Sequence, residues 1–253
     1  MFPLRDENPT VRKPVATMVL IGANAVCWML LQGFGTDPSL AESLCYYALI
    51  PGDLFGNVLP GETIRVSETR ACVLDGTANP STLLTSMFMH GGWFHILGNM
   101  WFLWVFGDNV EDAMGPFRFV AFYVLCGLAA AFAQIATDPS SPVPMVGASG
   151  AIGGVMGAYA LLYPRAHVHT FVFLGFYMTT IAVPAVFMLG YWFLIQLVSG
   201  LPTLGQSGGG VAFWAHIGGF AAGLALVLLF RRPEYVAAHR AQAERRVSRH
   251  RWM

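Results

Sequence analysis

Charged side chains are scarce in this chain, and their scarcity decides the class of protein. Of its 253 residues only 11% are Asp, Glu, Lys or Arg, whereas 55% are hydrophobic. A soluble globular domain carries about 25% charged residues, so the composition predicts a polytopic membrane protein. The chain also lacks a basic stripe, which argues against a nucleic-acid partner. Its polar start, "MFPLRDENPTVRKP", lacks the small-residue cleavage site of a secretory signal peptide.

Six stretches are apolar enough to cross a bilayer, for which about 20 residues suffice. They lie at 15–33, 87–107, 117–136, 145–163, 170–199 and 211–230. The fifth is too long for one straight helix and contains Pro184, so we expect an irregular entry segment followed by a span over 183–199. The predicted fold class is an all-α membrane protein with six transmembrane helices over residues 15–230. An N-terminal segment (1–14) precedes the helices and a basic tail (231–253) follows them.

Lys and Arg are distributed unevenly between the two sides that six spans define. Twelve of them fall on the side of both termini, and only Arg65 and Arg70 fall on the other. Because cytoplasmic loops carry the excess of Lys and Arg, both termini are predicted to be cytoplasmic. The loops 34–86, 137–144 and 200–210 are then external. We expect the basic tail to be a solvated anchor near anionic lipid headgroups rather than a dedicated binding element.

Only four cysteines are present, and two of them fall in the long external loop. Cys45 and Cys72 would face an oxidising compartment, where they could form a disulfide. Two buried free thiols are the alternative, and the sequence leaves both open. Cys27 and Cys126 lie within spans and are expected to be packing residues.

Polar residues inside the predicted spans are few, and four of them fall at one depth. The span directions place His95 and Asn99 in the outer half of the second span. They place Ser149 near the start of the fourth span and His216 about five residues inside the sixth, counted along the helix. Because polar groups inside a membrane are costly, their common depth predicts a constructed site.

Glycine spacing predicts that the fourth and sixth helices touch. The pairs Gly150–Gly154, Gly153–Gly157 and Gly219–Gly223 would let helix backbones approach closely in lipid. Contact there would bring Ser149 within hydrogen-bond reach of His216. A serine beside an imidazole is the basic unit of nucleophilic catalysis, in which the histidine takes the hydroxyl proton and later returns it to the leaving group. The sequence offers no acidic residue at this depth to orient the histidine.

Attack on a carbonyl also needs hydrogen-bond donors for the developing oxyanion. The Ser149 backbone amide, unpaired in a first helical turn, and the side chains of His95 and Asn99 could supply them. Structural interpretations compete: Ser149 could be a helix N-cap, and His216 could be a satisfied core histidine. His95 and Asn99 could be interhelical hydrogen-bond partners. Nothing ties three other histidines to this cluster, and we expect them to be structural or interfacial: His90, His167 and His169.

These residues resemble the motifs of the rhomboid family of intramembrane serine proteases. The family's nucleophile motif G-x-S-G matches Gly147-Ala148-Ser149-Gly150. Its A-H-x-x-G motif on the sixth helix matches residues 215–219, and H-x-x-x-N on the second matches residues 95–99. The resemblance covers residues 87–230 strongly and residues 15–86 weakly.

The resemblance implies a bacterial-type six-helix bundle that cleaves transmembrane protein substrates near the edge of the lipid bilayer, without metal or cofactor. It implies Ser149 as the nucleophile and His216 as the general base, with His95, Asn99 and the Ser149 amide forming the oxyanion hole. The site would open to the periplasmic side of the inner (cell) membrane. A catalytically inactive relative that binds transmembrane helices is the alternative. The oligomeric state is not implied.

The resemblance further implies a structural hydrogen-bonding role for Glu111, a flexible cap over 201–210 and a lateral gate in the fifth span. Two positions depart from the family pattern. Many members carry an aromatic residue four positions after the serine, where this chain has Gly153. A Trp-Arg pair of the first external loop is absent here, and Arg70 is followed by "ACVLDG".

Overall fold

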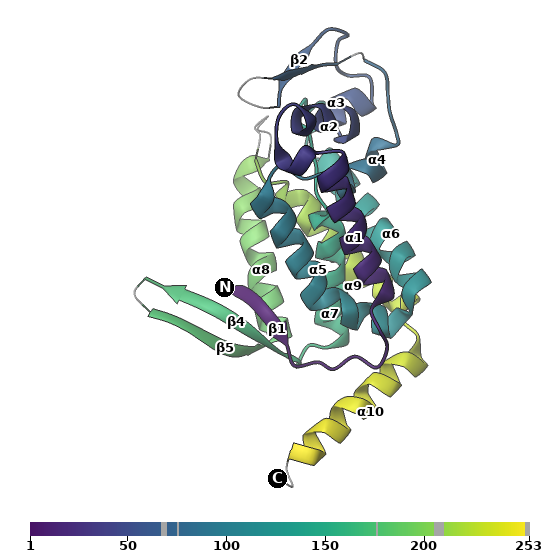
Figure 1. Cartoon of the computed structure of the whole chain (residues 1–253), viewed down its shortest axis with the longest axis vertical. Coiled ribbons are helices and arrows are strands. Elements are labelled where there is room, and N and C mark those ends of the chain that lie inside the picture. The colour runs from purple at the N-terminus through teal and green to yellow at the C-terminus, as the bar shows by residue number, and fades with distance from the viewer. Residues whose placement is uncertain (67–69, 75, 176, 205–209, 251–253) are drawn as a thin grey trace.

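Apolar runs of the sequence form the helices of a bundle (Figure 1), in a computed structural model that describes residues 1–66, 70–74, 76–175, 177–204 and 210–250. The bundle helices are α1 (Val15–Leu30), α5 (Trp93–Met114), α6 (Pro116–Ile135), α7 (Ser149–Leu162), α8 (Ala185–Gly200) and α9 (Phe213–Phe230). By length and composition, α6, α8 and α9 could each cross a membrane, whereas α1 and α7 are shorter apolar helices. The predicted second span, 87–107, is displaced, because α5 begins only after Gly91 and Gly92 and continues through three acidic residues to Met114.

Helix α7 lies at the centre of the bundle and is packed tightly against α9. Glycine makes this approach possible: a Cβ on Gly219 would collide with the carbonyl of Gly150, and one on Gly223 with the carbonyl of Gly154. A Cβ on Gly157 would likewise meet the carbonyl of Phe220. The contact between the fourth and sixth predicted helices is confirmed. It fixes the relative position of Ser149 and His216.

The segment expected to enter the fifth span irregularly is instead a regular hairpin. Strands β4 (His167–Leu174) and β5 (Tyr177–Pro184) pair antiparallel, and β1 (Phe2–Asp6) adds to β4, so that the sheet order is β1-β4-β5. The hairpin projects sideways from the bundle in Figure 1. The prediction of an all-α fold is therefore wrong at this point. The run is rich in β-branched and aromatic residues, which favour strands.

The long loop between α1 and α5 covers the opposite end of the bundle from α10 (Figure 1). It contains α2 (Ser39–Tyr47), α3 (Pro51–Leu54), β2 (Thr63–Arg65), β3 (Ala71–Val73) and α4 (Thr82–Thr85). A disulfide joins Cys45 to Cys72, which settles the alternative that the sequence left open. Buried apolar side chains pack around it: Ile50, Val58, Ile64 and Leu74. This loop is thus anchored without the Trp-Arg pair, whereas Cys27 and Cys126 remain free thiols.

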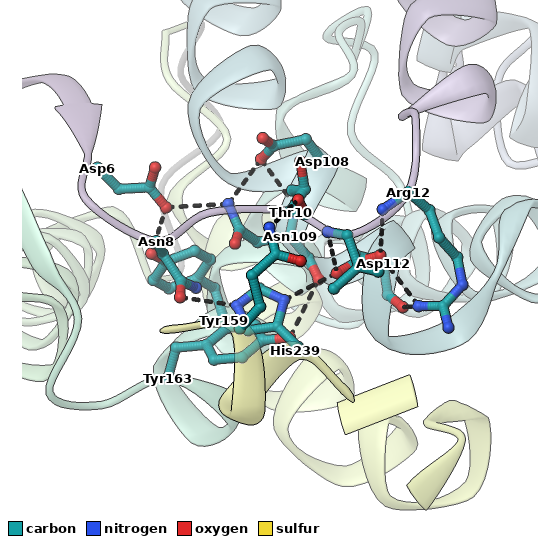
Figure 2. Close-up of polar contacts among 12 residues, drawn as sticks. Asp6, Asn8, Thr10, Arg12, Asp108, Asn109, Asp112, Tyr159, Tyr163 and His239 are labelled. Atoms are coloured by element: carbon teal, nitrogen blue, oxygen red, sulfur yellow. Dashed lines mark hydrogen bonds and ion pairs between the residues drawn. The ribbon is translucent and has the colours of Figure 1, made fainter. Parts of the chain in front are cut away.

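Helix α10 (Pro233–His250) packs against the N-terminal segment and the end of α5 (Figure 2). Its His239 is 1% exposed, with Nδ1 2.8 Å from Asp112 Oδ2 and Nε2 2.7 Å from Asn8 Oδ1. Arg12 also pairs with Asp112, at 3.1 Å. The expectation of a simply solvated tail is wrong for this half of the helix, because a buried histidine docks it.

Glu111 is buried where α5 meets the start of α1. Its carboxylate accepts hydrogen bonds from the backbone N–H groups of Ala16 (2.9 Å) and Thr17 (2.7 Å) and from the Thr17 hydroxyl (2.8 Å). The first N–H groups of a helix lack partners within it, and no side chain of the Pro14 cap supplies one. Glu111 therefore caps α1 from another helix, which is the structural hydrogen-bonding role implied for it.

Candidate active site

Ser149 is the first residue of α7 and points toward α9. Gly147, two residues before it, has φ +121°, a conformation that favours glycine and turns the chain into the helix. The N-cap is Ala148, so Ser149 is not the cap and its hydroxyl is free to bond elsewhere. The Ser149 Oγ lies 2.8 Å from His216 Nε2. At this distance the hydroxyl can donate its proton to the imidazole.

The second ring nitrogen of His216 also has a partner. His216 Nδ1 lies 2.8 Å from Oε1 of Gln196, which is 7% exposed and belongs to α8. Sequence reasoning missed Gln196, although it is the single amide in the apolar run of residues 185–200. A polar group in such a run needs a partner, and this rule could have flagged it.

The histidine is also flanked by a ring, although position 153 carries none. The centroid of the Trp192 ring of α8 lies 5.8 Å from that of the His216 ring. The centroids of the Trp192 and Phe220 rings are 6.1 Å apart. A Cβ on Gly153 would lie 3.0 Å from the backbone carbonyl oxygen of His216, so an aromatic side chain there would force α7 and α9 apart. The ring beside the histidine therefore comes from a different helix.

His95 and Asn99 lie on one face of α5, next to Ser149. His95 Nδ1 accepts the Gly91 backbone N–H at 3.2 Å, which leaves the ring proton on Nε2, beside the Gly147 backbone. The buried Nδ2 of Asn99 has no hydrogen-bond partner within the described residues. Two N–H donors thus remain near the serine. Of the three histidines expected to lie outside this cluster, His169 pairs with Glu7 and His167 lies on β4. The buried His90, in contrast, packs edge-on against His95 and so touches the cluster.

A cavity of about 760 Å³ joins these side chains. Ser149, His216, His95 and Asn99 all line it, from three helices, and Trp192 adds a fourth. Apolar residues complete its walls: Phe94, Phe102, Met145, Ile152 and Phe213. Thr203 and Gly210 line it as well, whereas residues 205–209 of the predicted cap lie outside the described residues. The cavity thus has polar groups beside the serine and mostly apolar walls elsewhere.

Among the described residues, no group of three or more His, Cys, Asp or Glu side chains is placed to hold a metal ion. Asp138 reaches the cavity wall, but its Oδ1 accepts hydrogen bonds from the Ser140 hydroxyl (2.9 Å) and backbone N–H (3.2 Å). What the arrangement offers chemically is a hydroxyl, an imidazole and N–H donors around one point.

Comparisons with known proteins match this part of the chain. The Rhomboid domain matches residues 78–233, which include every residue of the cavity cluster just described. Rhomboid protease GluP of Bacillus subtilis is 38% identical over 148 residues, 58% of this chain and 26% of that protein. The human mitochondrial presenilin-associated rhomboid-like protein is 32% identical over 127 residues, 46% of this chain and 33% of that protein. RHOMBOID-like protein 5 of Arabidopsis thaliana is 37% identical over 76 residues, 30% of this chain and 25% of that protein. The chain thus spans a third or less of the length of these relatives.

Proposed function

The chain belongs to the rhomboid family, and on that premise we propose that it is an intramembrane serine endopeptidase acting through Ser149 and His216. The observation that carries the proposal is the 2.8 Å contact between Ser149 Oγ and His216 Nε2 at the wall of the cavity. A protein that only binds helices needs neither this contact nor the unpaired Asn99 Nδ2 beside it.

The reaction follows from the positions of these atoms. His216 Nε2 takes the proton as Ser149 Oγ bonds to the carbonyl carbon of the substrate. The Asn99 amide, the His95 Nε2–H and the Ser149 backbone N–H donate to the oxyanion that forms. When the C–N bond breaks, the leaving amine takes the proton from His216, and water then hydrolyses the acyl-enzyme with the same histidine as base.

The membrane setting is part of the proposal. We take α1, α5, α6, α7, α8 and α9 as six spans, with both termini cytoplasmic and Ser149 in the outer third of the bilayer. Helix α7 has 14 residues, about 21 Å, which is shorter than the hydrocarbon core. The cavity would therefore open to water on the outer face, the periplasmic side of a bacterial cell membrane. The excess of Lys and Arg on the side of the termini supports this orientation.

Substrates would be transmembrane proteins cut near the outer boundary of the bilayer. A helical substrate must unwind before its peptide bond reaches Ser149, because helical carbonyls are hydrogen-bonded and shielded. We therefore expect small residues at the cleaved bond and helix-weakening residues beyond it.

The test is cleavage in proteoliposomes of a panel of single-span proteins that differ in helix-weakening residues. Wild type is expected to cut the panel members with weakened helices, and Ser149→Ala to cut none. Ser199→Ala, another serine of the bundle but outside the cavity, is the matched control and should cut like wild type. If wild type bound the panel without cutting any member, the helix-binding alternative would hold instead.

A further inference from the structure

Both ring nitrogens of His216 have a hydrogen-bond partner, and only one of these partners, Ser149, belongs to the proposed Ser–His pair. Nε2 faces Ser149 Oγ, whereas Nδ1 faces Gln196 Oε1, each at 2.8 Å. For Nε2 to accept a proton from Ser149 it must carry a lone pair, so the ring proton must be on Nδ1. An acceptor opposite Nδ1 is what selects that tautomer.

The amide of Gln196 is itself oriented for this role. Its Nε2 lies 3.5 Å from the backbone carbonyl oxygen of Trp192, one helical turn earlier on α8. Turning the amide over would set Oε1 against the Trp192 carbonyl oxygen, so that two acceptors would face each other, and would present the NH₂ group to Nδ1, which suits only a ring without a proton on that nitrogen. The observed orientation presents an acceptor to the histidine.

We propose that Gln196 is a positioning residue that fixes His216 in the Nδ1–H tautomer. It would do for this site, with a neutral amide, what a carboxylate does in a Ser–His–Asp triad. The proton stays on Nδ1 throughout, and no proton passes to the amide. The catalytic consequence rests on the proposed function, but the effect on the tautomer does not.

The same contact makes the site depend on the packing of three helices. Ser149 comes from α7, His216 from α9 and Gln196 from α8, which also supplies the Trp192 ring beside the imidazole. Helix α8 thus provides both the acceptor opposite Nδ1 and the ring beside the imidazole. The role that an aromatic residue after the serine would have filled is shifted to α8 in this chain.

The first test is the tautomer itself, read by ¹⁵N NMR of histidine-labelled full-length protein, with His216→Ala assigning the signal. Wild type is expected to carry the proton on Nδ1, whereas Gln196→Leu is expected to show the Nε2–H form or a mixture. Gln32→Leu is the matched control: Gln32 is a buried amide bonded to the His90 backbone, and its loss should leave the His216 signal unchanged.

The second test is kinetic and separates positioning from mere packing. Gln196→Leu is expected to lower kcat by about 10- to 100-fold with little change in KM, because the wrong tautomer cannot accept the serine proton. Gln196→Glu keeps an acceptor and adds a charge that favours imidazolium. It should retain more activity than Gln196→Leu, and the acid limb of its kcat/KM profile should move up by about one pH unit or more.

If Gln196 had only a structural role, Gln196→Glu would be less active than Gln196→Leu, because a buried carboxylate would disturb α8 more than leucine does. Gln196→Leu with the wild-type tautomer and wild-type kcat would overturn the inference. If wild type cleaved no substrate and did not react with a fluorophosphonate, while its His216 tautomer still depended on Gln196, the proposed function would fail. The positioning role of Gln196 would then still stand.

Discussion

The two ends of the bundle each hold a buried or half-buried histidine against an oxygen acceptor at 2.8 Å, yet their surroundings differ. At the tail end, His239 faces Asp112, whose carboxylate also accepts from the backbone N–H groups of Val11 and Arg12 and pairs with the Arg12 guanidinium. At the other end, His216 faces a neutral amide and a hydroxyl at the wall of the 760 Å³ cavity.

This difference separates a polar group that holds the fold from one that can react. The Asp112 carboxylate is saturated with donors, so His239 gains a fixed partner and α10 a fixed position. The donors near Ser149 are not saturated, since Asn99 Nδ2 is buried without a partner among the described residues. Asn99 lines the cavity, so this donor is available to a group that enters it.

The largest expected effect is the loss of cleavage when either member of the Ser149–His216 pair is removed. Ser149→Ala and His216→Ala should each lower the cleavage rate by about 10³-fold or more, because both members of the pair act as a unit. Neither change should lower the unfolding temperature by more than a few degrees, as measured by thermal unfolding in detergent. Residual cleavage of either variant near the wild-type rate would contradict the assignment.

The next largest effect is a loss of stability when the carboxylate that caps α1 is removed. Glu111→Ala leaves two backbone N–H groups and the Thr17 hydroxyl without their acceptor, and should lower the free energy of unfolding by about 3 kcal/mol or more. Activity per folded molecule should be retained, as counted by active-site titration. Glu234 is an exposed carboxylate on α10, so Glu234→Ala serves as the control and should change the free energy of unfolding very little. Equal loss in both variants would speak against the capping role.

A smaller effect tests the docking of the tail. His239→Ala should lower the free energy of unfolding by about 1–2 kcal/mol, because Asp112 keeps Arg12 but loses its buried ring partner. Exposed Arg240→Ala, on the same helix, should change it by less than about 0.5 kcal/mol. Protease sensitivity of α10 provides a second measurement, and a tail equally protected in both variants would show that His239 does not dock it.

A pH-dependent effect is expected at strand β1. Burial raises the pKa of Asp6 to about 6 from its ordinary 3.8, even though the Tyr159 hydroxyl donates to its carboxylate and opposes the rise. The folded chain therefore binds this proton more tightly than the unfolded chain does. Asp6 favours the fold below pH 4, and this contribution is lost as pH rises through 6. Asp6→Asn should remove that part of the slope of the unfolding temperature between pH 4 and 7; parallel curves for the two proteins would argue against it.

Local spacing accounts for what could be predicted of this fold. In each glycine pair of α7 and α9 the two members are four residues apart and share a helix face. The contact between these helices can therefore be predicted from a short stretch of sequence. The hairpin at 167–184 could not be told from a span entry, because a continuous apolar run carries no periodicity that separates buried strand from helix. Its partner strand, β1, is more than 160 residues earlier in the chain.

The same reasoning explains which site residues were predicted. Ser149, His216, His95 and Asn99 stand in short motifs at a shared depth, which a single sequence displays. Gln196 belongs to no such motif, and only the packing of α8 on α9 brings its Oε1 to His216. The docking of α10 was hidden for a similar reason, since His239 and Asp112 are 127 residues apart.

The central claim, that Ser149 is a nucleophile activated by His216, can be tested without knowing any substrate. Purified protein would be treated with a fluorophosphonate, and the modified residue mapped by mass spectrometry in wild type, Ser149→Ala, His216→Ala and Ser199→Ala. We expect a single adduct on Ser149 in wild type and Ser199→Ala, and none in the other two. Labelling that survived Ser149→Ala, or an unlabelled wild type, would contradict the account.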